Sequence, residues 1–151
     1  MTSRNGYSIY WSSYNYPTEI RGPAETFLFS YTPDRQRWRQ VSASSAGTET
    51  TFYIGGALEK TILADGSTDY RHTVYAGGQA VAMISRSSTG TNSVHYLIED
   101  HEGSSTTITN SDGSLAVEES FDAFGNPRSP LDWSNPQTAA DQALIANLTR
   151  H

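Results

Sequence analysis

The stretch DGSTDYRHTVYAGGQAVAMISRSSTG, residues 65–90, shows how the chain is organised. Glycine turn signals at Gly66, at Gly77-Gly78 and at Gly90 enclose two segments, 68–76 and 79–87. Residues in the first segment alternate in character, which gives an extended strand two chemically distinct faces. The stretch therefore predicts a β-hairpin flanked by further turns.

Similar turn signals recur through the middle and later chain at steps of 10 to 13 residues. Such spacing is typical of successive short antiparallel strands. Glycine is favoured in these turns because it adopts positive φ at little steric cost. The turn signals are Gly55-Gly56, Asp65-Gly66-Ser67, Gly77-Gly78, Thr89-Gly90-Thr91, Glu102-Gly103-Ser104, Asp112-Gly113-Ser114 and Phe124-Gly125-Asn126.

The segments between the turns predict an all-β, antiparallel meander of β-hairpins with about nine or ten strands. Strand and helix segments do not alternate, so a parallel βαβ sheet is not expected. Pro17 and Pro23 bracket what we expect to be an irregular link. The expected strands are 7–11, 26–31, 35–41, 48–54, 57–64, 68–76, 79–87, 91–99, 105–110 and 114–122.

The end of the chain differs from the rest and predicts one short C-terminal helix. Residues 135–151 are rich in Ala, Leu and Gln, and four apolar residues recur at helical spacing. The preceding segment, 124–136, carries three prolines and is expected to be a loop. We therefore divide the chain into a sheet region, 1–134, and a helical tail, 135–151. The apolar residues of the helix are Ala140, Leu144, Ile145 and Leu148.

Composition limits the class of protein. The net charge of −6, with a single lysine and no long cationic run, argues against a nucleic-acid partner. Arg35, Arg37 and Arg39 are expected on one solvated face of a strand. The chain has no cysteine, and its N-terminus lacks the apolar run of a signal peptide. No stretch approaches membrane-spanning length, and the localisation stays unassigned.

A hydrophobic fraction of 36% is low for a compact globule. It fits a thin sheet with one wet face or a part of something larger. An open meander leaves unpaired backbone on its outer strands, which closure, self-association or continuation of the sheet would satisfy. Of these we expect continuation into a longer sheet, with self-association through the edges as a further outcome.

One stretch resembles a known family. Residues 96–128, YLIEDHEGSSTTITNSDGSLAVEESFDAFGNPR, look like the start of the Rhs-associated core of Rhs/YD-repeat proteins. The upstream FSYTPDRQRWRQ, 29–40, is similar to a YD repeat, and RHTVYAGGQAVAMIS, 71–85, is similar to strands that precede the core. The resemblance covers roughly 7–130. The residues that match the family motif are Tyr96, Asp100, His101, Gly103, Ser104, Asp112, Gly113, Phe121, Asp122, Phe124 and Gly125.

The resemblance implies an architecture and a role. Rhs proteins, toxin-complex shell proteins and teneurin ectodomains wind such hairpins into a hollow shell, which in bacterial members encloses a C-terminal toxin. The chain would then be a fragment of a shell that encapsulates and helps deliver a polymorphic toxin. Its partners would be the remainder of the shell and the toxin cargo, and the parent protein would be secreted or delivered by a bacterial secretion system.

The sequence departs from the family pattern in three ways. Glu102 stands where a leucine is usual, and Ser105-Thr106 replaces a common Val-Arg pair. The sequence stops at His151, before the Asp-Pro-x-Gly boundary where the self-cleaving aspartates of the family lie. We therefore expect neither the cleavage chemistry nor the toxin in this chain.

The Asp100-His101-Glu102 cluster beside Ser104 raises the alternative of a hydrolase site. Asp100 and His101 are sequence neighbours and would point to opposite faces of a strand. No nucleophile-elbow pattern surrounds Ser104. We expect a tight turn in which Asp100 caps backbone amides, and no enzyme and no catalytic residue.

Metal and cofactor sites are not expected either. His72, His95, His101 and His151 are far apart in sequence and lack metal-ligand spacing. Asp65, Asp112 and Asp122 lie in turn signals, where a carboxylate usually caps backbone N–H groups, and a calcium site there is the minor alternative.

A second function remains open, namely a free-standing β-rich module that binds carbohydrate or a protein surface. An aromatic stretch near the N-terminus could stack on sugars, although cross-strand aromatic pairing explains it as well. This stretch comprises Tyr7, Tyr10, Trp11, Tyr14 and Tyr16.

Overall fold

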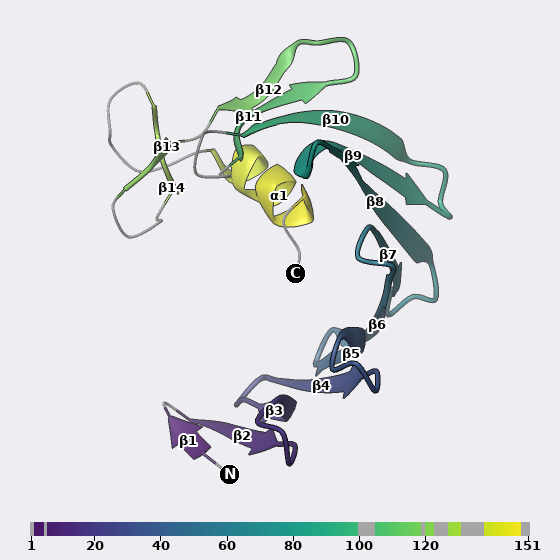
Figure 1. The fold of residues 1–151 in the computed structure, drawn as a ribbon, viewed down its shortest axis with the longest axis vertical. Helices are drawn as coiled ribbons and strands as arrows, with labels where there is room; N and C mark the ends of the chain where they lie inside the picture. The colour runs from purple at the N-terminus through teal and green to yellow at the C-terminus, as the bar shows by residue number, and fades with distance from the viewer. Residues whose placement is uncertain are drawn as a thin grey trace. The chain divides into compact units, whose positions relative to one another are not determined.

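The fold is an antiparallel meander in which strands β1 to β12 pair with their neighbours in sequence (Figure 1). The computed structural model describes residues 2–4, 6–99, 105–118, 120–122, 127–130 and 138–148. Strands β1 to β12 follow one another in hydrogen-bonded order, and β13 and β14 form a separate two-stranded sheet. The predicted all-β hairpin meander with one short C-terminal helix is confirmed, with more strands than predicted.

The chain divides into two compact units, each described by itself. The first unit comprises Met1–His72 and Ser85–Asn92, and the second comprises Thr73–Ile84 and Ser93–His151. Strands β8 and β9 contribute to both units. The strands of the first unit are β1 (Thr2–Arg4), β2 (Tyr7–Trp11), β3 (Pro17–Arg21), β4 (Glu25–Tyr31), β5 (Arg37–Ser44), β6 (Gly47–Ile54) and β7 (Leu58–Ile62). The shared strands are β8 (Thr68–Ala76) and β9 (Gln79–Ser87).

The second unit contains the later strands and the helix. The predicted bounds of β8 and β9 are confirmed, and those of β10 and β11 are met within one residue. The elements are β10 (Asn92–Glu99), β11 (Ser105–Asn110), β12 (Leu115–Glu118), β13 (Ser120–Phe121), β14 (Pro127–Arg128) and α1 (Ala139–Leu148).

Five of the connecting turns share one hydrogen-bond pattern. In each, the first N–H donates to the carbonyl four residues on, and the fourth N–H donates back to the first carbonyl. The fourth residue has positive φ in every case, which is why glycine recurs there. The predicted turn glycines are confirmed wherever they fall in the described residues. The five turns are 12–16, 32–36, 63–67, 87–91 and 110–114, with Asn15, Arg35, Gly66, Gly90 and Gly113 at the fourth position.

The predicted irregular link between Pro17 and Pro23 is wrong, because β3 runs through it. Ile20 is paired with Ile9 on β2 and with Phe27 on β4. Pro17 is the first residue of the strand, where the missing N–H costs little. Pairing on both sides therefore outweighs the proline signal.

The prediction that three arginines share one face of a strand is also wrong. Arg35 lies in the 32–36 turn, and β5 begins at Arg37. The pairing with β4 shifts at this point, from Ser30↔Arg39 to Tyr31↔Arg37. The shift breaks the alternation: the Arg37 guanidinium lies 4.7 Å from the Tyr53 ring centre, whereas Arg39 is paired with Phe52.

The predicted single strand at 114–122 is divided. β12 ends at Glu118, and β13 belongs to the two-stranded sheet with β14, which lies inside the predicted loop 124–136. Most of that loop lies outside the described residues.

Helix α1 spans Ala139–Leu148 and lies within the predicted helical tail, 135–151, of which residues 135–137 and 149–151 lie outside the described part. Its start is fixed by a reciprocal capping contact. The Thr138 Oγ1 accepts a hydrogen bond from the Asp141 N–H, and the Asp141 carboxylate accepts one from the Thr138 N–H.

Among the residues whose burial is described, the apolar core belongs to the second unit. The buried cluster consists of Met83, Ile108 and Val117, and Leu144 and Ile145 of α1 pack against it together with Leu97 and Ala116. Among the predicted apolar residues of the helix, Ala140 is exposed, so it does not belong to the buried face. No described helix has the length and apolar character needed to cross a membrane.

Candidate functional site

The turn at 100–104, for which the sequence raised the alternative of a hydrolase site, lies outside the described residues. Asp100, His101, Gly103 and Ser104 belong to this turn. Phe124 and Gly125 of the family motif lie in a second segment outside the described residues, 123–126. The interpretation of 100–104 as a tight corner therefore stays a prediction.

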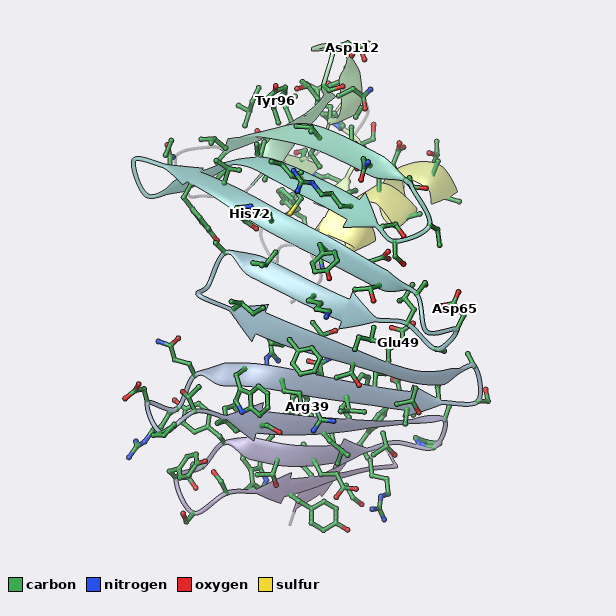
Figure 2. The ribbon with its side chains drawn as sticks, turned by 90° about the vertical axis from the view of Figure 1, so that its right-hand side faces the viewer. Arg39, Glu49, Asp65, His72, Tyr96 and Asp112 are labelled. Carbon is green, nitrogen blue, oxygen red and sulfur yellow. The ribbon has the colours of Figure 1, made fainter. Side chains whose placement is uncertain are left out.

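The described motif residues are distributed over separate structural roles. Tyr96 is exposed on β10 (Figure 2) and is paired with Thr109. Phe121 is paired with Pro127 in the small sheet. Gly113 has positive φ in the 110–114 turn. Asp122 follows β13 and is half-buried. The structure thus gives these residues pairing and turn positions in two sheets.

Asp65 and Asp112 cap their turns as predicted. The Asp65 Oδ1 accepts hydrogen bonds from the Ser67 N–H at 2.8 Å and from the Ser67 hydroxyl at 2.6 Å. The Asp112 Oδ1 makes the same two contacts with Ser114, at 2.9 and 2.6 Å. Within the described ranges no three His, Cys, Asp or Glu side chains gather as a metal site would need. The turn carboxylates are therefore used as acceptors for the backbone.

The capping contact leads to a first prediction. Hydrogen bonds from the Ser114 hydroxyl and then from its N–H lower the pKa of Asp112 below its ordinary value of 3.8. We expect Ser114→Ala to raise the pKa of Asp112 toward that value, because the hydroxyl contact is the larger cause. The carboxyl carbon signals of Asp112 and Asp65, followed by NMR from pH 6 to pH 2, measure the change.

The turn at Asp65 is the internal control for this experiment, because Ser67 supplies the same contacts there. An unchanged Asp112 titration in Ser114→Ala would contradict the role of the hydroxyl. Since each native carboxyl has a lowered pKa, its contribution to stability is present above the unfolded pKa and is lost as the pH falls through the folded pKa.

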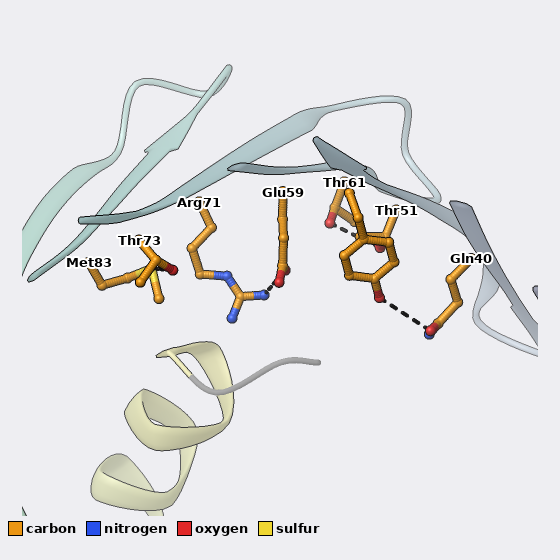
Figure 3. Close-up of polar contacts among 8 residues, drawn as sticks. Gln40, Thr51, Glu59, Thr61, Arg71, Thr73 and Met83 are labelled. Atoms are coloured by element: carbon orange, nitrogen blue, oxygen red, sulfur yellow. Dashed lines mark hydrogen bonds and ion pairs between the residues drawn. The ribbon is translucent and has the colours of Figure 1, made fainter. Parts of the chain in front are cut away.

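The first unit carries a row of polar contacts across β5 to β8, which the sequence did not predict (Figure 3). The register places Gln40, Thr51 and Thr61 directly opposite one another, so their side chains share one face. The Thr51 and Thr61 hydroxyls are 3.1 Å apart, and Thr61 is buried. This face is therefore held by hydrogen bonds between neighbouring strands.

A second rung lies on the same face. Tyr53, Glu59 and Arg71 are opposite one another in the register. The Arg71 guanidinium lies 2.7 Å from a Glu59 carboxylate oxygen, and the Tyr53 hydroxyl donates to the Gln40 side chain at 3.3 Å. Burial is the main cause that raises the pKa of Tyr53 above its ordinary value of 10.0, which further favours the protonated hydroxyl that donates to Gln40.

The described residues also contain an aromatic cluster that joins two turns. Tyr14 and Tyr16 contact each other at 5.6 Å, and Tyr16 contacts Tyr31 at 5.2 Å between ring centres. The Arg35 guanidinium lies 5.5 Å from the Tyr14 ring centre, and the Tyr31 hydroxyl donates to the Pro17 carbonyl at 2.8 Å. We call Tyr14, Tyr16, Tyr31 and Arg35 the tyrosine–arginine cluster.

Only part of the aromatic stretch predicted from the sequence comes together in the structure. Tyr14 and Tyr16 join the cluster, but Tyr10 lies beside Arg21, whose guanidinium is 5.9 Å from its ring centre. Tyr7 and Trp11 are exposed. The sequence did not predict that Tyr31 and Arg35 join them, because these two residues lie at the end of β4 and in the following 32–36 turn, well separated from Tyr14 and Tyr16 along the chain.

The described histidines differ in environment. His72 is exposed on β8 (Figure 2). His95 is buried on β10. His101 and His151 lie outside the described residues.

Comparison with known proteins assigns no family. No protein-family model matches the chain, and no curated protein is similar enough to count as a relative. The resemblance to Rhs/YD-repeat proteins therefore rests on the motif residues within 96–128 and on the arrangement of hairpins.

Proposed function

We propose that the chain is a structural segment of an Rhs/YD-repeat shell, which encloses and helps deliver a polymorphic toxin, and that it is not an enzyme. One observation carries the proposal: β1 to β12 follow one another as a single meander of hairpins with recurring turns. A long wall can be built by repeating such a unit, because each hairpin needs only its neighbours.

The burial pattern supports a wall. Among the residues whose exposure is described, the buried apolar side chains are Ala82, Met83, Ile108 and Val117, all of the second unit. In the first unit, the strands are instead joined by the contacts of Thr51–Thr61, Tyr53–Gln40 and Glu59–Arg71. An antiparallel sheet can leave one face in water, so a wall between two aqueous spaces need not bury both of its faces in a dry core.

The proposed partners are strands that pair with the free edge of β12. Within the described residues, β12 pairs with β11 on one side and has no further neighbour in the sheet. An unpaired strand edge is a template for another strand. In the proposed shell, a strand of the remaining shell occupies this edge, and in the isolated chain a second copy takes its place.

The proposal is tested first at the gene. The reading frame, or an adjacent one, should encode further YD repeats, the remaining part of the core and a toxin. In that longer protein, deletion of residues 65–114 should open the wall and make the cargo sensitive to added protease. A frame without such repeats, or a cargo that stays protected after the deletion, would count against a shell.

The tyrosine–arginine cluster supports a second candidate function, the binding of carbohydrate. Arg35 has φ 64 at a turn position that three of the five equivalent turns fill with glycine. A non-glycine residue in this region costs about 1 kcal/mol, and such outliers often mark functional sites. Tyr14 and Tyr16 are exposed beside it, and tyrosine rings stack well on sugars.

A glycan array tests this candidate directly. We expect Tyr14→Ala to lower any glycan binding at least tenfold, because stacking on the exposed ring would be lost. Tyr75→Ala, at another exposed tyrosine outside the cluster, is the matched control. If the chain binds no glycan, or if both variants lose binding equally, the cluster is not a sugar site.

A further inference from the structure

His95 is a buried histidine whose ring lacks a full set of partners. Its side chain lies on β10 with a relative exposure of 9%, and its Nδ1 has no hydrogen-bond partner among the described residues. A buried polar atom without a partner is uncommon and costs free energy. Such an atom calls for an explanation beyond strand packing.

The register places His95 on the face that carries the helix. His95 is paired with Asn110, and Leu97 is paired with Ile108. Alternate residues of a strand point to the same side, so His95 shares its face with Leu97 and Ile108. Leu144 and Ile145 of α1 pack against the cluster on this face.

The described charged groups of the neighbouring elements offer His95 no close carboxylate. β11 has no titratable residue, and Glu118 of β12 is paired with Thr107, which alternates with Ile108 and so lies on the other face. Asp141 of α1 accepts hydrogen bonds from Thr138.

The remaining charged and titratable groups on β9 and β10 do not compensate a positive charge on His95 either. Arg86 of β9 is exposed and carries the same sign as a protonated histidine. Glu99 lies four residues further along β10, a span of about 13 Å. Tyr96 points to the opposite face from its neighbour His95. Protonation of His95 would therefore place an uncompensated charge against the apolar cluster.

Burial alone lowers the pKa of His95 below its ordinary value of 6.5, because the charged ring loses water. Since the unfolded ring takes up its proton at a higher pH, the folded form is favoured fully only above about pH 6.5. Its advantage falls as the pH drops from the unfolded pKa to the lower folded pKa.

We propose that His95 is a proton-sensitive latch for α1, whose protonation releases the helix from the face formed by Met83, Ile108 and Val117. A charged imidazole needs water, and water reaches this face when the helix leaves. The strands are held by backbone ladders, whereas the ten-residue helix is held mainly by its side chains. The helix is therefore the element that yields first.

Hydrogen exchange of the α1 amides tests the latch in the full chain. Rates are compared at pH 7.5 and 5.0 after division by the intrinsic rate at each pH. We expect protection of α1 to fall at pH 5.0, by up to tenfold for each unit by which folding lowers the pKa. His95→Gln should keep α1 protected at both values, and His72→Gln, at an exposed position, should behave as the wild type.

A titration of the wild-type histidine signals by NMR keeps the proposal testable if His95→Gln does not fold. We expect the His95 ring to titrate below 6.5 and the α1 signals to move with it. A His95 ring that titrates at or above 6.5, or α1 protection that is the same at both pH values, would overturn the latch. Loss of protection at pH 5.0 in His95→Gln as well would assign the release to another group.

Discussion

Ile108→Ala is expected to lower the free energy of unfolding by about 3 kcal/mol, the largest effect of any single substitution that we predict. The Ile108 side chain is 2% exposed and packs in one cluster with Met83 and Val117. Truncation of a fully buried isoleucine removes its transfer free energy and leaves a cavity, which together cost about 2–5 kcal/mol. Urea unfolding followed by circular dichroism measures the change.

The effect should also reach the helix, because Leu144 and Ile145 pack against the same cluster. We expect Ile108→Ala to lose helical signal at a lower urea concentration than the wild type. Ile98→Ala is the matched control, since Ile98 is on the neighbouring strand but is 54% exposed. A loss within about 1 kcal/mol in both variants would show that the cluster does not hold the second unit together.

The strands were predictable where local signals suffice. The segments 68–76 and 79–87 match β8 and β9 in both bounds, because glycine turns at each end coincide with alternating side chains between them. Gly66, Gly90 and Gly113 all have positive φ, as turn chemistry requires. Backbone conformation at a turn depends on the few residues in it, so the sequence is informative there.

Features that depend on distant residues were not predictable. β3 forms because Ile20 finds partners on both sides, which no signal within 17–21 reveals. The register shift opposite Ser30 and Tyr31 separates Arg37 from Arg39, although the spacing of the two predicts a common face. In both cases pairing between strands decides the outcome over local preference.

The candidate sites show the same limit. The capping of turns by Asp65 and Asp112 was predicted, since each carboxylate contacts a serine two residues away. The burial of His95 was not predicted, because it depends on residues distant in sequence, such as its partner strand β11. The alternation around Arg71 in the sequence predicts that its strand has two different faces. That Glu59 is the partner of Arg71 is known only from the register of β7 and β8.

The pair Glu59–Arg71 provides the second large prediction. The two side chains are 21% and 11% exposed, and the charged atoms are 2.7 Å apart. Glu59→Leu is expected to lower the free energy of unfolding by about 2 kcal/mol, because the largely buried guanidinium keeps its charge and loses this carboxylate. The value lies between the loss of about 3–5 kcal/mol for a fully buried pair and that of an exposed pair.

A double-mutant cycle separates the interaction within the pair from the cost of removing one partner alone. We expect the combined change Glu59→Leu and Arg71→Leu to recover at least half of the loss, because the guanidinium that loses the Glu59 carboxylate is then removed as well. Glu19→Leu is the matched control: its partner Arg21 is at 2.6 Å, but the arginine side chain is 60% exposed, so a loss of no more than about 1 kcal/mol is expected.

The cycle also bears on how the sheet is held together. If the contacts across β5 to β8 stabilise the first unit, the loss in Glu59→Leu should appear in the unfolding of the whole unit, because each strand is paired with the next. Equal losses for Glu59→Leu and Glu19→Leu would mean that the Glu59–Arg71 contact behaves as a surface pair. The polar face would then contribute little to stability, and backbone pairing between strands would be the main force that holds this part of the sheet.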